Sequence, residues 1–137
     1  MQDFTFSKPQ SSMLLIARVL LMLLFVLFGY QKLIHFSGTI GYMASLGTPL
    51  PTVAALIAVV LEFFAGLAIV VGYFTRPIAL IVAIYTLGTA IIGHPFWSLS
   101  GADQMAAEIN FYKNISIIGG LLLLSVTGAG RYSLDKH

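Results

Sequence analysis

Four long apolar segments restrict what this chain can fold into. They cover about residues 13–33, 52–72, 77–93 and 110–127. A helix that crosses a bilayer needs about 20 mostly apolar residues, and the polar backbone groups of such a segment must be satisfied inside a helix or a closed barrel. The segments therefore predict an all-α integral membrane protein, a bundle of four transmembrane helices.

The composition supports one membrane domain. The chain has 137 residues, of which 58% are apolar and 9% charged, against about 25% charged residues in an ordinary soluble domain. Four helices and their connections use nearly all of residues 1–137, so we expect a single domain. The first apolar segment is too long for a signal peptide and is followed by "FGYQKLIHF", which has no small-residue cleavage site. We interpret it as a retained helix.

Cysteine is absent, which excludes thiol catalysis, disulfides, thiolate-held iron–sulfur clusters and covalent c-type haem. Any redox role must therefore use a bound molecule. We predict no metal site. The net charge of +2 comes with no basic cluster dense enough for nucleic acid, so no nucleic-acid partner is expected.

Basic residues predict the orientation. One side of the membrane, which holds both termini, carries Lys8, Arg76, Arg131 and Lys136. The connections on the other side carry only Lys32, Asp103 and Glu108. Since cytoplasmic loops of membrane proteins are enriched in lysine and arginine, we expect both termini in the cytoplasm.

The two outer connections contain more than turn residues. "FSGTIGYMASLGTPLP" has apolar residues at helical spacing before a glycine and two prolines, which predicts a short interfacial helix. "GHPFWSLSGADQMAAEIN" places Phe96 and Trp97 where an aromatic belt belongs. Both connections are interpreted as interfacial anchors or, alternatively, as a lid over a cavity.

Polar residues inside the apolar segments form the candidate site. Each helix carries a polar stripe, and because such groups are costly in contact with lipid, the stripes should face one another. The candidate ligand-binding residues are Arg18, Lys32, Glu62, His94, Asn110, Lys113 and Asn114.

Glu62 is the most unusual of these residues, because the helical rise places it near the middle of the bilayer. Such a carboxylate needs a partner or a task. We predict Arg18 as the first-choice partner, with Lys113 or Lys32 second. The pair either only fixes helix packing or belongs to a ligand or proton site.

The remaining candidates also have two interpretations. His94 either bonds to backbone or water at a helix end or contacts a ligand. Haem ligation by His35 and His94 is a third option. Lys113 either reaches the interface with its long side chain or, together with Asn110 and Asn114, contacts a ligand.

Several stretches together resemble the DoxX family, over the chain from Leu15 to Asp135. They are "ARVLLMLLFVLFGYQKL", "LEFFAGLAIVVGYFTRP", "AIIGH", "NFYKNISIIGGLLLL" and "GAGRYSLD". The chain has "GAG" where the family usually has Gly-Pro-Gly, and it is most similar to DoxX-like proteins of the bacterial inner membrane. The resemblance implies a four-helix bundle in that membrane. Some family members are named as subunits of quinone-linked systems or as partners of membrane oxidoreductases.

Our leading hypothesis is an accessory or quinone-binding subunit of a membrane redox system. We expect a cavity in the outer half of the bundle, bounded by Glu62, His94, Asn110 and Lys113. No residue here carries electrons unaided, so an oxidoreductase partner would be required and the chain alone is not expected to be an enzyme. The alternative is proton-coupled or small-solute transport, for which a homo-oligomer is expected, or a structural membrane role without chemistry.

Overall fold

The computed structural model describes residues 6–135, and within this range it is built from helices and turns, with no strand. In chain order the elements are α1 (Lys8–Ile34), α2 (Phe36–Ser45), α3 (Pro51–Val59), the π-helix η1 (Val60–Phe64), α4 (Ala65–Val71), α5 (Thr75–Gly93), the 3₁₀ turn η2 (Phe96–Ser98) and α6 (Gly101–Thr127).

Four helical spans in this range are long and apolar enough to cross a membrane, namely Lys8–Ile34, Pro51–Val71, Thr75–Ser98 and Gly101–Thr127. The second span is α3, η1 and α4 in continuous succession. The predicted fold class is confirmed, and so is the short helix in the first outer connection, which is α2.

Two helices begin earlier than their apolar segments. α6 starts at Gly101 rather than near residue 110, because Asp103, Gln104 and Glu108 lower the hydropathy of its first turns without preventing helix formation. α1 starts at Lys8 rather than near residue 13. There the Ser7 hydroxyl accepts from the backbone N–H of Gln10 at 3.3 Å, and the Gln10 side chain accepts from the backbone N–H of Ser7 at 2.9 Å, which is a capping box.

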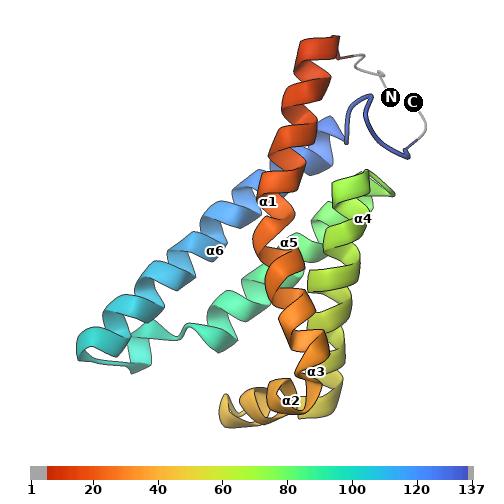
Figure 1. Ribbon diagram of the computed structural model, residues 1–137. Helices are drawn as coiled ribbons and strands as arrows, with labels where there is room; N and C mark the ends of the chain where they lie inside the picture. Colours follow the sequence, from red (N-terminus) through yellow and green to blue (C-terminus); the bar gives the residue numbers. More distant parts are fainter. Residues whose placement is uncertain (1–5, 136–137) are drawn as a thin grey trace.

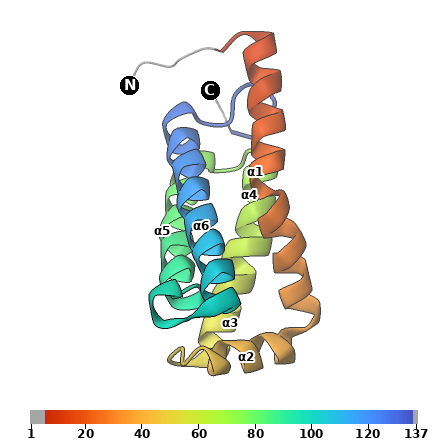
Figure 2. The same cartoon turned by 90° about the vertical axis from the view of Figure 1, so that its left-hand side faces the viewer.

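The helices form two antiparallel pairs. α1 packs along the α3–η1–α4 span, and α5 packs along α6. The start of α1, the α4–α5 turn and the end of α6 lie at one end of the molecule, whereas α2 lies across the other end (Figures 1 and 2). The two pairs diverge toward the end that holds α2 (Figure 1). Both ends of the described chain therefore lie at one end of the molecule (Figure 1). That this end faces the cytoplasm stays a prediction, and Lys136, used in the orientation argument, lies outside the described residues.

Arg18 stabilises the end of the bundle where the two ends of the described chain lie. Its guanidinium donates to the backbone carbonyls of Val70 at 3.1 Å and Tyr132 at 2.7 Å, and also to that of Ala129. The side chain is 1% exposed. Arg18 thus ties α1 to α4 and to the segment that follows α6.

The same C-terminal segment caps α5. The carboxylate of Asp135 accepts from the backbone N–H groups of Phe74 at 2.7 Å and Thr75 at 3.1 Å. The first N–H groups of a helix have no partner inside it, so this carboxylate supplies one and also suits the positive end of the helix dipole. The "GAGRYSLD" stretch therefore closes the fold at this end.

Gly29 sets how closely α1 approaches the second span. A Cβ atom at this position would lie 2.5 Å from the backbone nitrogen of Phe63 and 2.9 Å from the Cβ of Glu62. Small residues of this kind let backbones come together in membrane bundles, where packing drives helix association. Gly29 therefore fixes the position of Glu62 along the axis of α1.

We predict that Gly29→Ala lowers the stability of the protein in detergent by about 1–3 kcal/mol, because the added methyl group meets backbone that cannot move without shifting a helix. Thermal unfolding of the purified protein measures this effect. Gly38→Ala is the control, since a Cβ there meets no atom within 4 Å and alanine favours the helix. Equal stability of the two variants would contradict the close contact.

Candidate ligand-binding site

A cavity of about 480 Å³ lies where the two helix pairs diverge. Its walls come from α1, the α3–η1 segment, α5 and α6, and α2 with the residues after it contributes at the end. Most of the lining is apolar, including Leu24, Phe25, Phe28, Met43, Leu46, Ile57 and Ile92. The volume falls in the range of about 300–1,000 Å³ that is typical of small-molecule sites.

Glu62 lies in the cavity wall with two partners. The Lys32 ammonium donates to Oε1 of Glu62 at 2.8 Å, and the Tyr85 hydroxyl donates to Oε2 at 2.5 Å. These residues come from α1, η1 and α5, and all of them line the cavity. The Lys32–Glu62–Tyr85 cluster thus joins three elements around one carboxylate.

The predicted pairing of Glu62 with Arg18 is wrong, and the second-choice partner Lys32 is correct. Gly29 contacts Glu62, and a rise of 1.5 Å per residue places Lys32 about 4.5 Å and Arg18 roughly 16 Å from that level along α1. Helical side chains also lean toward the helix N-terminus. Lys32 therefore leans toward Glu62, whereas Arg18 leans away from it toward the C-terminal segment.

The π-helix η1 positions this carboxylate. Glu62 is the central residue of Val60–Phe64 and is 9% exposed. A π-helical turn adds a residue relative to the α-helix and changes which side chains share a face, and such turns occur often at functional sites. The irregular turn coincides here with the single carboxylate that lines the cavity.

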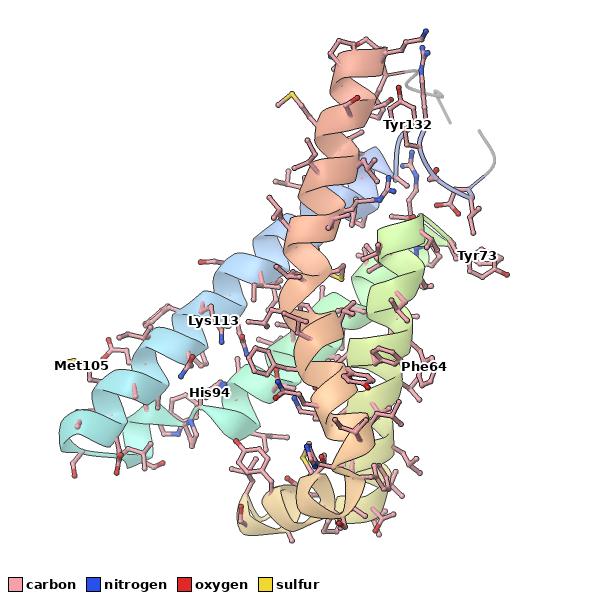
Figure 3. The ribbon with its side chains drawn as sticks, viewed as in Figure 1. Phe64, Tyr73, His94, Met105, Lys113 and Tyr132 are labelled. Carbon is pink, nitrogen blue, oxygen red and sulfur yellow. The ribbon has the colours of Figure 1, made fainter. Side chains whose placement is uncertain are left out.

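A second group of polar side chains lines the cavity from α5 and α6. The Asn114 amide donates to the Thr89 hydroxyl at 3.3 Å, and that hydroxyl donates to the Thr86 carbonyl at 2.9 Å. His94, directly after α5, and Lys113 in α6 also line the cavity (Figure 3). The structure thus brings Lys32, Glu62, His94, Lys113 and Asn114 to one cavity.

Two of the predicted residues do not line this cavity. Arg18 lies at the other end of the bundle, where it binds backbone carbonyls, and is not part of the lining. Asn110, expected in the cavity wall, is not part of the lining. Its amide donates to the Ala106 carbonyl at 3.0 Å within α6, and its carbonyl accepts from Lys113 at 3.2 Å. Asn110 therefore contacts the lysine rather than the cavity.

The histidine pair considered for haem is not brought to one site. His94 lines the cavity, whereas His35 joins α1 to α2 and does not line it. Among residues 6–135, no three His, Asp or Glu side chains lie together in a way that could hold a metal ion.

Tyr85 was not predicted as a site residue. It lies in the middle of α5, whereas tyrosines of membrane helices concentrate at the two interfaces. This unusual depth is the sequence signal that could have identified it. Its partner could not have been named from sequence, because that required the packing of α5 against η1.

Comparison with known proteins places the chain among inner-membrane proteins. The DoxX family model matches residues 13–95. Inner membrane protein YphA of Escherichia coli is 50% identical over 134 residues, which cover 98% of this chain and 96% of YphA. Inner membrane protein YqjF of the same organism is 41% identical over 125 residues, covering 89% of this chain and 88% of YqjF. The ER-derived vesicles protein ERV29 of Saccharomyces cerevisiae is 26% identical over 94% of this chain but only 34% of ERV29. No solved structure matches the chain.

We predict that a double-mutant cycle detects coupling between Lys32 and Glu62. Glu62→Gln leaves the lysine without its counter-charge, and Lys32→Met leaves the carboxylate without its counter-charge. The two single variants together should therefore lose more free energy of unfolding than the double variant loses. Unfolding in detergent should give a coupling of about 1–3 kcal/mol. The matched cycle of Arg18→Met with Glu62→Gln should be additive. If only that cycle showed coupling, Arg18 rather than Lys32 would be the partner of Glu62.

Proposed function

The chain belongs to the DoxX family of inner-membrane proteins, and we propose that its cavity binds a quinone or a similar ring-bearing lipid for a membrane redox system. The observation that carries this proposal is the junction of an apolar cavity with the Lys32–Glu62–Tyr85 cluster. Apolar walls with a few convergent polar groups are typical of small-molecule sites.

The polar cluster suits the oxygen atoms of a quinone. A lysine ammonium has three N–H donors, of which Lys32 uses one for Glu62, so others remain for a ring carbonyl. The carboxylate is an acceptor and can take a proton from a quinol hydroxyl. On the other side of the cavity the Asn114 amide has a second N–H beyond the one given to Thr89.

The proposed role is that of an accessory subunit. Reduction of a quinone to a quinol consumes two electrons and two protons, and oxidation of the quinol releases them. The electrons pass to or from a partner oxidoreductase, since none of the cavity side chains carries them. Glu62 accepts or returns one proton at a ring oxygen, as a general acid–base group does, and the second proton is exchanged with water.

We propose that both termini face the cytoplasm, because lysine and arginine concentrate at that end. The chain has no cysteine, so single cysteines can report the sidedness. Ser98→Cys should react with a membrane-impermeant maleimide added to intact spheroplasts, and Lys8→Cys should react only after lysis. If only Lys8→Cys were labelled in intact spheroplasts, the termini would face the periplasm and the proposed orientation would be wrong.

Ligand binding can be blocked without removing a polar group. Gly88 lines the cavity, and a Cβ there would meet no atom within 4 Å. We predict that Gly88→Leu fills the cavity and abolishes the rise in melting temperature that a short-chain quinone causes in the wild type. The variant itself should be at least as stable as the wild type, because leucine favours a helix over glycine by about 0.5–1 kcal/mol.

Gly119→Leu is the matched control for this experiment. A Cβ at Gly119 also meets no atom within 4 Å, but Gly119 is in α6 away from the cavity lining, so this variant should keep the full quinone response. The proposed function would be abandoned if the quinone leaves the melting temperature of the wild type unchanged, or if both variants respond equally.

A further inference from the structure

The two polar groups of the cavity differ in charge. In the Lys32–Glu62–Tyr85 cluster the ammonium and the carboxylate compensate each other. In the other group the Lys113 ammonium donates to the uncharged Asn110 carbonyl at 3.2 Å. Within residues 6–135 the Lys32–Glu62 pair is the one side-chain ion pair. The α6 side of the cavity therefore carries a positive charge that the paired side lacks.

The other carboxylates of the described chain do not compensate this charge. Asp135 binds the backbone of Phe74 and Thr75 at the opposite end of the bundle. Asp103 and Glu108 lie in α6 but do not line the cavity. Lys113 is an exposed residue that also lines the cavity, and no carboxylate of the described residues pairs with it, so an anion bound in the cavity would be stabilised at Lys113.

The spacing of the two groups constrains the ligand. Tyr85 lies in α5 and His94 directly follows the last residue of that helix, nine residues further along the chain, which corresponds to about 13 Å along the helix axis. Between them Gly88, Thr89 and Ile92 line the cavity. A molecule that reaches both groups must be elongated, with one oxygen near Lys113 and another near Tyr85.

We propose that the ligand is an amphipathic ring acid, whose ionised phenolic, enolic or carboxylic oxygen binds Lys113. A neutral oxygen at its other end accepts from Lys32, whose ammonium has N–H donors beyond the one given to Glu62, and its apolar body contacts the cavity walls. This inference rests on the proposed ring-binding function and narrows it from quinones in general to acidic ring compounds. An ammonium paired with an anionic oxygen makes a charge-assisted hydrogen bond, which is stronger than a neutral one.

The test uses two probes that differ in charge but share a ring system. 2-Hydroxy-1,4-naphthoquinone is an anion at neutral pH, and its methyl ether, 2-methoxy-1,4-naphthoquinone, is neutral. Both are titrated into the full-length protein in neutral detergent, and Kd is measured by calorimetry. We expect the hydroxy compound to bind the wild type about tenfold more tightly or better.

Variants at Lys113 test whether this residue recognises the negative charge of the probe. Lys113→Gln should remove the preference for the anion and leave Kd of the methoxy compound nearly unchanged, whereas Lys113→Arg should keep the preference. Lys8→Gln is the control, because it removes the same charge from an exposed residue far from the cavity. A preference that survives in Lys113→Gln overturns the proposal.

The remaining outcomes separate this inference from the function on which it rests. Equal binding of both probes to the wild type overturns the acidic-ligand proposal and leaves ring binding intact. If neither probe binds, both proposals fail. An anion could also come from a phospholipid headgroup, so the titrations are repeated with added phosphatidylglycerol. If that lipid displaces the hydroxy compound and itself binds in a Lys113-dependent manner at lower concentration, the site is a headgroup site and the ring-acid proposal is wrong.

Discussion

A carboxylate in the middle of a membrane-spanning helix must be partnered, and the arrangement of this bundle follows from how Glu62 is partnered. A charged group in a membrane-spanning segment is costly without partners, and the oxygens of Glu62 accept from Lys32 and Tyr85. Three elements must then meet at one level. Gly29 allows this by admitting the backbone of η1 to close contact with α1. A larger residue at that position would separate Lys32 from the carboxylate as well as the two helices.

The two ends of the bundle use their polar residues differently. At one end the C-terminal segment closes the structure, since Arg18 binds its carbonyls and Asp135 caps α5. At the other end the helix pairs diverge and leave the cavity. Arginine suits the closed end because its planar group can serve several carbonyls at once. A lysine in its place would have fewer donors in a less favourable geometry, so Arg18 and Lys32 are not interchangeable.

Much of the fold and part of the site could be predicted from the sequence. The same physical reasons explain which features could not be predicted. The apolar segments and the glycine–proline stop before Pro51 identify the spans and α2, because bilayer thickness and turn chemistry act locally. The polar character of Glu62 and His94 is equally visible. The partner of Glu62 could not be predicted. The axial register between helices depends on a contact such as that of Gly29, which no local sequence pattern encodes. Asn110 was misplaced for a similar reason, since a shared helical face does not say which neighbour that face meets.

Access to the cavity bears on what can occupy it. Phe28 and Tyr42 line the cavity, yet they remain 46% and 50% exposed. At the depth of a membrane-spanning helix, an exposed aromatic side chain such as that of Phe28 faces lipid tails rather than water. Under the proposed function, a ligand would enter sideways from the bilayer past these exposed side chains. Since occupancy depends on ligand concentration relative to Kd, modest affinity is sufficient for such a site. This favours a lipid-soluble ligand over a solute that must arrive through water.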